Sequence, residues 1–412
     1  MKPKYLPEEE MIVVQKYGGT SVESTEKILK IANKVSKDYD RGNKIVVVVS
    51  AMGKTTNYLI DLLNQVNSNA NPREYDMIAS TGEQVSIALM ASALSKLGKK
   101  AISLTGFQAG IDTDSTHSRA TLKRIYRGRI LSLLDEGFIP VVAGFQGISP
   151  DGEITTLGRG GSDTTAVAIA YGIGADLCEI YTDVDGVYTA DPRYVERPKK
   201  LDKVSYDEMI EMAVNGAKVL HPRSVELARR YHVKVVVKHA HKESDGTIIE
   251  EAGKLEEPLV RSLSVDEGIV KIVLSGVPDV PGIAASTFKK LAQYHVSLDM
   301  IVQSMHKDGK NDIAFTVSKE ESRDALKAME MLKHEMELDG IYFDDTMAKI
   351  SIIGVNIVGS SEIVYNMFDA IASAGANIDM ISTSNSRISC IVKREKVKEA
   401  AKAVAKRFGL EE

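Results

Sequence analysis

Residues 155–170 read Thr-Thr-Leu-Gly-Arg-Gly-Gly-Ser-Asp-Thr-Thr-Ala-Val-Ala-Ile-Ala, a glycine-rich stretch that runs directly into an apolar helical segment. Glycine has no Cβ, so the backbone amides of Gly158, Gly160 and Gly161 can approach a ligand closely. The amides that open the following helix carry positive partial charge, which favours an anion. Arg159 adds a fork of donors suited to a carboxylate or phosphate, and Asp163 needs a cation or a donor beside it. Taken alone, the stretch fits an anion site and an ordinary glycine turn with a solvated ion pair equally well.

A strand, a glycine loop and a helix are also predicted near the amino terminus. Residues 11–15 are apolar and strand-like, Lys16 to Ser21 read Lys-Tyr-Gly-Gly-Thr-Ser, and residues 22–37 repeat apolar side chains at helical spacing. The lysine stands before its glycines, unlike in a Walker loop or the dinucleotide fingerprint. From the strand end its ammonium would reach over the loop to transferring phosphate oxygens. The alternative is a surface lysine beside a turn.

Polar residues that could contact a substrate follow the next predicted strand. Residues 44–49 are a continuous Val/Ile run, typical of a strand buried on both faces of a parallel sheet, and they end in Ser50. Open α/β sheets bind ligands at such strand ends, although Ser50 and Thr56 could equally cap a helix or close a turn. In the following helical pattern, residues 75–97, Gly82 predicts a break or a close backbone approach. Glu83 either meets a cation such as a substrate ammonium or caps a helix start as a solvated acid.

The strand at residues 178–181 leads into an acidic and aromatic segment, Thr182 to Arg193. One interpretation is a nucleoside site, with Tyr188 against the base and the carboxylates directed toward the ribose or a metal. The alternative is that two ordinary turns account for the same residues. Strands alternate with helices from residue 11 to about 245, which predicts an α/β domain with a largely parallel sheet. Within it, residues 121–134 are predicted as a basic helix with a solvated face. No metal ligand is assigned.

Beyond residue 245 the chain contains a repeat. Lys271-Ile-Val-Leu-Ser-Gly-Val277 is echoed by Lys349-Ile-Ser-Ile-Ile-Gly-Val355, and Leu298-Asp-Met-Ile301 by Ile378-Asp-Met-Ile381. Each copy also carries an amphipathic helix, which predicts two small α+β modules. Such modules suggest a ligand sensor, and a dimerisation role is compatible with that. The predicted domains are a catalytic domain at 1–245, a connector at 246–264 and modules at 265–345 and 346–412.

Composition excludes several classes of function. A net charge of −5 without a block of lysines or arginines argues against a nucleic-acid or membrane-surface role. No apolar run reaches membrane-spanning length, and the first ten residues lack the apolar core of a signal peptide, which predicts a cytoplasmic protein. Cys178 and Cys390 lie in apolar, strand-like surroundings and are expected to be reduced core thiols.

Five motifs in order resemble those of the aspartate kinases, a family with the amino acid kinase fold. They are Lys16-Tyr-Gly-Gly-Thr-Ser-Val22, Ser50-Ala-Met-Gly53, Thr81-Gly-Glu83, Thr156-Leu-Gly-Arg-Gly-Gly-Ser-Asp-Thr164 and Asp183-Val-Asp-Gly-Val-Tyr-Thr-Ala-Asp-Pro-Arg193. The likeness covers nearly the whole chain, and the repeat resembles the two ACT modules of that family. It implies phosphorylation of the L-aspartate side-chain carboxylate to 4-phospho-L-aspartate by ATP with Mg²⁺, the first step of lysine, threonine and methionine synthesis.

The resemblance also implies residue roles. Lys16 and Asp163 would be the catalytic pair, with Lys16 neutralising the transferring phosphoryl group. Arg159 would hold the α-carboxylate of aspartate and Glu83 its α-ammonium. The other substrate residues would be Ser50, Thr56, Gly160, Gly161 and Ser162. The nucleotide would be surrounded by Lys16, Gly18, Gly19, Thr182, Asp183, Tyr188, Asp191, Arg193 and Lys218.

In the repeat, the resemblance implies feedback regulation by lysine and/or threonine bound between ACT modules of paired subunits in a homo-oligomer. The matching residues are Asp279, Pro281, Gly282, Ile283, Ala284, Ser297, Asp299, Gln303, Asn377 and Ile378. Relatives often carry Pro-Gly in the second module where this chain reads Ser360-Ser-Glu-Ile363, which argues against an effector site on that loop. The sequence leaves no room for the homoserine dehydrogenase domain of bifunctional relatives, so a monofunctional enzyme is expected.

Two alternatives remain open from the residues. Another amino acid kinase, acting on glutamate, N-acetylglutamate or a nucleotide, fits because Arg159 and Glu83 favour a free α-amino acid without fixing its side-chain length. A non-catalytic amino acid sensor that kept the fold is the second, and intact Lys16 and Asp163 argue against it.

Overall fold

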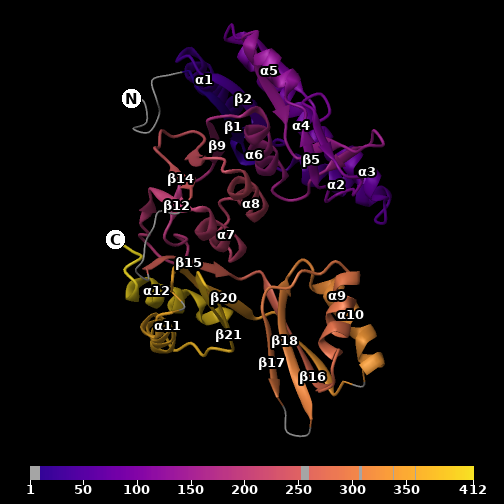
Figure 1. Ribbon diagram of the computed structural model, residues 1–412, viewed down its shortest axis with the longest axis vertical. Coiled ribbons are helices and arrows are strands. Elements are labelled where there is room, and N and C mark those ends of the chain that lie inside the picture. Colours follow the sequence, from indigo (N-terminus) through magenta and orange to yellow (C-terminus); the bar gives the residue numbers. More distant parts are fainter. Residues whose placement is uncertain (1–9, 252–258, 306–308, 337, 358) are drawn as a thin grey trace. The chain divides into compact units, whose positions relative to one another are not determined.

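The computed structural model describes residues 10–251, 259–305, 309–336, 338–357 and 359–412, which form two units (Figure 1). The first unit comprises Met1–Val187, Lys200–Ala213 and Lys218–Lys254. The second comprises Tyr188–Lys199, Val214–Ala217 and Leu255–Glu412. Two short stretches from the predicted catalytic domain therefore belong with the carboxyl-terminal unit. Within the described ranges, no helix combines the length and hydrophobicity needed to span a lipid bilayer.

An eight-stranded sheet forms the centre of the first unit. Its strands are β1 (Ile12–Tyr17), β2 (Lys44–Val49), β3 (Ala101–Leu104), β6 (Ile139–Ala143), β9 (Leu177–Thr182), β12 (Lys203–Ser205), β13 (Val235–His239) and β14 (Thr247–Glu250). The spatial order is β12-β14-β13-β9-β1-β2-β6-β3, and every neighbouring pair except β13 and β14 is parallel. The predicted α/β fold with a largely parallel sheet is confirmed.

Helices cover both faces of this sheet because its central strands are apolar on both sides. The helices are η1 (Gly19–Val22), α1 (Thr25–Asp40), α2 (Thr55–Val66), α3 (Pro72–Ala79), α4 (Thr81–Lys96), α5 (Gly128–Asp135), α6 (Gly161–Ile173), α7 (Tyr206–Val214) and α8 (Pro222–Tyr231). On one face, α1 and α4 pack against Val47 and its neighbours in a buried core. On the other, α6 and α8 pack around Ile180 of β9.

The position of β1 explains where a site can form. β1 lies between β2 and β9, so the chain leaves it toward one side of the sheet and returns later on the other. The carboxyl ends of these three parallel strands therefore lie side by side at one edge. Open α/β sheets bind ligands at such a reversal of strand order.

A smaller sheet, ordered β5-β4-β7-β8, corrects the prediction for residues 121–134. Its strands are β4 (Ile111–Thr113), β5 (Leu122–Ile125), β7 (Gln146–Ile148) and β8 (Ile154–Thr156). The first part of the predicted basic helix is β5, which pairs antiparallel with β4, and α5 begins only at Gly128. The prediction was wrong because Leu, Lys and Arg favour a helix locally, whereas pairing with β4 satisfies the backbone as a strand.

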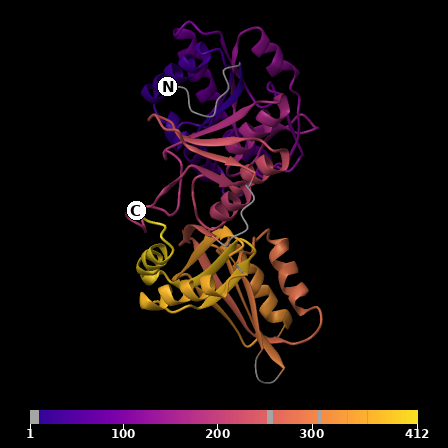
Figure 2. The ribbon, with the colours of Figure 1, turned by 60° about the vertical axis from the view of Figure 1, so that its left-hand side comes forward.

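The second unit contains the two repeated modules, and Figure 2 shows helices lying against each sheet. The first module has the sheet order β17-β18-β16-β19 and the second β15-β20-β22-β21. The strands and helices are β15 (Leu259–Asp266), β16 (Ile269–Pro278), α9 (Ile283–Gln293), β17 (Ile301–Met305), β18 (Lys310–Ser318), α10 (Ser322–Met336), β19 (Gly340–Asp344), β20 (Met347–Val355), α11 (Ser361–Ser373), β21 (Met380–Ser384), β22 (Arg387–Lys393), η2 (Arg394–Lys396) and α12 (Val397–Arg407). The prediction of two tandem α+β modules is confirmed.

The boundaries of the modules differ from the prediction. β15 pairs antiparallel with β20, from Leu259↔Val355 to Asp266↔Lys349, so part of the predicted connector 246–264 is an edge strand of the second module. β14, from the same connector, belongs to the sheet of the first unit. The first module is therefore inserted between two strands of the second. Local sequence carries no sign of this, because the partner of β15 lies beyond the whole first module. Residues 252–258 of the connector lie outside the described residues.

Candidate functional site

Lys16 and Asp163 meet at the carboxyl end of β1. Lys16 Nζ lies 2.6 Å from Asp163 Oδ1, and the two side chains are only 10% and 12% exposed. Lys16 is the penultimate residue of the central strand β1, and Asp163 stands in the first turn of α6. Among the described residues, Asp163 Oδ1 receives no well-directed hydrogen bond, so its contact with Lys16 is an ion pair. The pair therefore presents a nearly buried cation and a carboxylate at the edge where a ligand would bind.

A buried polar network under Lys16 was missed by the sequence analysis. The carboxylate of Glu179 on β9 accepts hydrogen bonds from Gln15 Nε2 (2.9 Å), Tyr181 Oη (2.9 Å) and Lys238 Nζ (2.6 Å). Burial alone would raise the pKa of Glu179, but Lys238 and the hydrogen bonds outweigh it and lower that pKa. The network ties β1, β9 and β13 together and supports the strand that carries Lys16. The available signal in the sequence was that each of two strands places polar side chains two positions apart on one face, Gln15 with Tyr17 and Glu179 with Tyr181.

The loops after β1 and β2 touch each other next to Lys16. A Cβ on Gly18 would lie 3.4 Å from Lys16 Nζ, and one on Gly19 would lie 2.9 Å from the carbonyl oxygen of Ala51. Gly53 N–H donates a hydrogen bond to the Gly19 carbonyl oxygen (3.0 Å). A side chain at Gly18 would fill space beside the ammonium, and one at Gly19 would collide with the neighbouring loop, so glycine at both positions keeps the two loops close and leaves room beside Lys16.

Glu83 is a buried carboxylate, and one of its two oxygens has no hydrogen-bond partner among the described residues. α3 ends at Ala79 and α4 begins at Thr81, so the predicted break near Gly82 is present, and a Cβ on Gly82 would lie 2.8 Å from that of Ala51. Ala51 N–H donates to Glu83 Oε1 (3.0 Å), while Oε2 has no partner among the described residues. The side chain is 3% exposed, and burial raises its pKa to about 7. The solvated-acid alternative is therefore wrong. Oε2 is buried without a partner among the described residues, an environment in which a carboxylate needs a cation or a donor.

The neighbouring substrate residues lie on adjacent elements. Ser50 follows the last residue of β2 and is half-buried, and its backbone N–H donates to the carbonyl oxygen of Tyr17 (3.1 Å). Thr56 is in the first turn of α2, also half-buried. Because Ala51 links Ser50 directly to Glu83, these groups belong to the same edge of the sheet as the Lys16–Asp163 pair.

The glycine-rich loop between β8 and α6 has the backbone that the sequence predicted. Gly158 and Gly160 have φ angles of 75° and 64°, and a Cβ on Gly160 would lie 2.2 Å from the side chain of His221. Arg159 stands exposed between them. α6 begins at Gly161, and its opening amides include that of Ser162, whose side chain packs on Gly144. Only glycine fits at position 160, so the loop is held close to the start of α8.

Asp76, which the sequence analysis did not single out, anchors this loop from behind. It is fully buried on α3 and accepts hydrogen bonds from Thr156 Oγ1 (2.5 Å) and Ser118 N–H (2.9 Å), with His117 Nδ1 at 2.8 Å. Thr156 is the last residue of β8, just before the loop. A buried carboxylate with these partners fixes the end of the strand from which Arg159 extends.

The predicted nucleotide residues are divided between the two units. Lys16, Gly18 and Gly19 lie together in the first unit, which also contains Thr182, Asp183 and Lys218. Thr182 Oγ1 donates to Asp183 Oδ1 (3.1 Å), and Lys218 is exposed. Tyr188, on β10 (Val187–Tyr188), and the ion pair of Asp191 with Arg193 (2.5 Å) lie in the second unit. A nucleotide site that uses both sets stays a prediction.

In the first module, the predicted effector residues lie on the loop that opens α9 and at the start of β17. Gly282 is the N-cap of α9 with φ 92° and provides no side-chain hydrogen bond, and Asn311 Nδ2 donates to Asp279 Oδ1 (3.0 Å). In the second module, Ser360 caps α11 by accepting a hydrogen bond from Ile363 N–H (3.4 Å). The amides that open α9 are thus free of a side-chain cap, whereas Ser360 occupies the equivalent position at α11.

Two further predicted effector residues, besides Asp279, have partners within the second unit. Ser297 N–H donates to Glu321 Oε2 (3.2 Å), and Asp299 forms an ion pair with Lys349 (2.5 Å). The equivalent pair of the repeat, Lys271 with Asp379, is also 2.5 Å apart. These reciprocal ion pairs join the two modules, so Asp299 has a structural partner whether or not an effector binds. Gln303 lies on β17, Asn377 is exposed after α11, and Ile378 packs on the second module's core.

A profile of the Amino acid kinase family matches residues 11–239, and an ACT domain profile matches residues 270–331 and 350–408. The aspartokinase of Mycolicibacterium smegmatis is 45% identical over 405 residues, which cover 97% of this chain and 96% of that protein.

Two solved structures of E. coli aspartokinase III are similar along the whole chain. The complex with aspartate and ADP, described as the R-state, has a TM-score of 0.83 at 25% identity and covers 97% of this chain and 100% of its own. The complex with lysine and aspartate, described as the T-state, has a TM-score of 0.77 at 25% identity and covers 96% and 99%.

Proposed function

The chain belongs to the aspartokinases of the amino acid kinase family, and we propose that its Lys16–Asp163 pair is the phosphoryl-transfer centre of this aspartate kinase. The enzyme phosphorylates the side-chain carboxylate of L-aspartate with ATP to give 4-phospho-L-aspartate. The observation that carries the residue assignment is the 2.6 Å contact between Lys16 and Asp163 beside the two glycine loops. Family membership sets aside the alternatives of another amino acid kinase and of a non-catalytic sensor.

The reaction needs positioning and charge neutralisation more than covalent help. A side-chain carboxylate oxygen of aspartate forms a bond to the γ-phosphorus, the bond from that phosphorus to the bridging oxygen breaks, and ADP leaves. The attacking carboxylate is ionised at neutral pH, so no general base is required. The ammonium of Lys16 would neutralise charge on the transferring group, and amides near Gly18 and Gly19 would hold phosphate oxygens. Asp163 would keep the ammonium in place.

The substrate is held by opposite charges at its two α-groups. Arg159 would form a forked contact with the α-carboxylate, and the unpartnered Oε2 of Glu83 would pair with the α-ammonium. The remaining contacts would come from Ser50, Thr56, Gly160, Gly161 and Ser162. The ammonium would relieve the cost of a charged, buried Glu83, so substrate binding and ionisation of Glu83 are coupled.

This coupling predicts that aspartate binding weakens in acid. The pKa of Glu83 is raised to about 7, so below that pH the free enzyme holds a neutral acid that attracts an ammonium poorly. The KM for aspartate should rise by roughly tenfold for each pH unit below about 7, whereas Glu83→Gln should have a high KM that changes little with pH. Initial rates at saturating ATP between pH 5.5 and 8.5 measure both.

Two controls distinguish a direct contact between Glu83 and the α-ammonium from a general effect of changing a buried carboxylate and from a pH effect due to the titration of ATP. Glu208→Gln, which changes another buried carboxylate, should keep the wild-type pH profile. Succinate lacks the α-amino group, so its inhibition constant should be the same for wild type and Glu83→Gln. Glu83 would be removed from the assignment if Glu83→Gln still binds aspartate more tightly than succinate to the same degree as wild type. It would also be removed if the wild-type KM for aspartate does not change below pH 7.

The nucleotide is ATP, and Mg²⁺ is proposed as its counter-ion. Mg²⁺ is usually held by phosphates, water and one or two carboxylates, without a dedicated protein cage. In the described ranges no three His, Cys, Asp or Glu side chains gather around a possible metal position. Thr182, Asp183, Tyr188, Asp191, Arg193 and Lys218 are proposed to contact the nucleotide. Dependence of the rate on added Mg²⁺ tests the first of these proposals.

The ACT modules are proposed to bind lysine and/or threonine at the α9 loop of the first module. The lysine complex of the E. coli relative and the uncapped amides that open α9 support this assignment. The exposed edge strand β17, with Ile301 half exposed, supports pairing of two subunits through this module. Sedimentation of the purified enzyme tests for the homo-oligomer.

The Asp279→Ala variant tests the effector site. We expect the inhibition curves for lysine and threonine, alone and together, to shift by about tenfold or more in this variant, because Asp279 begins the α9 loop and a charge-assisted contact contributes ~1.5–3 kcal/mol. Glu362→Ala, at the start of α11, is the matched control and should retain wild-type inhibition. Identical curves for wild type and Asp279→Ala would place the effector elsewhere.

A further inference from the structure

A second cavity in the first unit lies apart from the residues assigned above. It has a volume of about 1090 Å³ and is lined by residues of the segment 107–110, by β5, the start of α5, the end of α6 and the end of α8. None of its sixteen lining residues belongs to the substrate, nucleotide or effector sets. Its size is in the range of pockets that hold small ligands.

The charge of this cavity is of one sign. Four cations line it, Lys123, Arg124, Arg127 and Arg129, and no aspartate or glutamate does. Lys123 is 3.7 Å from Asp114. Asp112 lies opposite Arg124 in the hairpin register but outside the cavity. Among the described residues, no carboxylate is within ion-pair distance of the three arginines, although the chain as a whole carries a net charge of −5.

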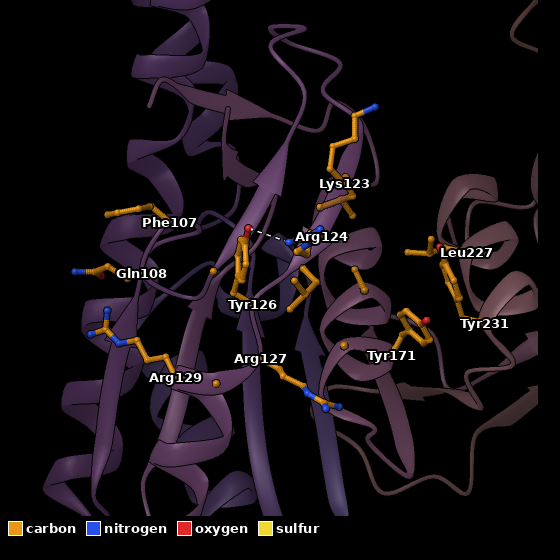
Figure 3. Close-up of a pocket in the computed structure, with 16 residues that line it drawn as sticks. Phe107, Gln108, Lys123, Arg124, Tyr126, Arg127, Arg129, Tyr171, Leu227 and Tyr231 are labelled. Atoms are coloured by element: carbon orange, nitrogen blue, oxygen red, sulfur yellow. Dashed lines mark hydrogen bonds between the residues drawn. The ribbon is translucent and has the colours of Figure 1, made fainter. Parts of the chain in front are cut away.

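Aromatic rings line the same cavity and remain unusually exposed. Phe107 is 65% exposed, and Tyr126 and Tyr171 are each 52% exposed. The Arg124 guanidinium lies 5.3 Å from the Tyr126 ring and donates to its hydroxyl (3.2 Å), while Tyr171 stacks on Tyr231 at 3.9 Å. Figure 3 shows Tyr126 between Phe107 on one side and Tyr171 with Tyr231 on the other. The open ring faces would stack on a planar ligand.

The walls of the cavity are held by close backbone packing. A Cβ on Gly110 would lie 2.7 Å from the carbonyl oxygen of Tyr126, and one on Gly172 would lie 2.8 Å from the side chain of Ile125. Tyr126 N–H also donates to the Gly110 carbonyl oxygen (2.8 Å). The aromatic and cationic groups therefore stand on backbone that needs little rearrangement on binding, which favours affinity.

We propose that this cavity is a second nucleotide site, separate from the catalytic centre, that binds a nucleoside phosphate by its base and its phosphates together. Arginine forks match phosphate oxygens, and the tyrosine and phenylalanine rings match a base. The proposal does not depend on the residue roles assigned to the catalytic centre. α6 carries Asp163 in its first turn and Tyr171 near its last, so the two sites share one helix.

The test is the number of ADP molecules bound per chain, measured by calorimetric titration of the full-length enzyme. Wild type should bind two, and Arg124→Glu and Tyr126→Ala should each bind one with full strength and the other at least about tenfold more weakly. Lys96→Glu, the same charge reversal at an exposed position on α4, should still bind two. Tripolyphosphate and adenosine should each bind the cavity at least tenfold more weakly than ADP.

Three other outcomes overturn the proposal, and a fourth contradicts the proposed function instead. One ADP per chain, unaffected by Arg124→Glu, means that only the catalytic centre binds nucleotide. One ADP that Arg124→Glu removes would instead contradict the nucleotide assignment at the catalytic centre. Tripolyphosphate that binds as tightly as ADP means a simple anion patch. A changed sedimentation coefficient in Arg124→Glu with an unchanged ADP count means that the cavity is a contact between copies of the chain.

Discussion

Replacing Lys16 by alanine is expected to reduce kcat by at least about 10³-fold, because it removes the cation proposed to neutralise the transferring phosphoryl group. The loss should appear in kcat at saturating ATP and aspartate. Coupled assay of ADP release measures it, and thermal unfolding by circular dichroism reports on the fold. Because Lys16 is nearly buried with Asp163, the variant leaves an uncompensated carboxylate, and some loss of stability is also expected.

A matched control separates catalysis from that loss of stability. Lys238 forms a similar buried pair with Glu179, at the same 2.6 Å distance and with 9% and 7% exposure of the two side chains. It lies in the polar network on the face of the sheet away from α6, so Lys238→Ala should lower stability comparably but kcat by less than about tenfold. Equal losses of kcat in the two variants would mean that Lys16 acts only as part of a buried ion pair.

The central sheet could be predicted because its signal is local. Each buried strand is a continuous run of Val and Ile, such as residues 44–49, and such runs identify parallel strands without knowledge of their partners. The pairing of Lys16 with Asp163 was expected from the family resemblance alone, and the local pattern indicated only that one stands near a strand end and the other near a helix start.

The missed features depend on partners outside the segment itself. β15 is a strand because β20, beyond the whole first module, pairs with it. β5 is a strand because the nearby β4 pairs with it, which its own residues do not indicate. Glu179 and Asp76 are important because of the donors around them, which come from several elements. A single polar residue within an apolar strand does not indicate from sequence which groups will form hydrogen bonds with it, because those groups are brought together only in the folded structure.

The loop that carries Arg159 shows how local and distant requirements combine. The positive φ angles of Gly158 and Gly160 follow from the glycines themselves, so the sharp path of the backbone was predictable. That a side chain at position 160 would collide with His221 was not, because His221 comes from α8. Together these constraints fix the backbone on both sides of Arg159, whose exposed side chain extends from between the two glycines.

Replacing Arg159 by alanine is therefore expected to change substrate binding without disturbing the fold. The KM for aspartate should rise by about 10²-fold, because a forked arginine–carboxylate contact contains two charge-assisted hydrogen bonds of ~1.5–3 kcal/mol each, only partly additive. The KM for ATP and the thermal unfolding temperature should stay close to wild type, since Arg159 is exposed. Initial-rate measurements with each substrate varied at saturating levels of the other give both constants.

Two further variants make the result specific. Arg159→Lys keeps the charge but not the planar fork, so it should recover only part of the lost affinity for aspartate. Arg230→Ala removes an exposed arginine on α8 and should leave both KM values unchanged. An aspartate KM that is unchanged in Arg159→Ala, or one that Arg159→Lys restores fully, would mean that the α-carboxylate is not held by this guanidinium. The glycine loop would then serve the phosphates alone.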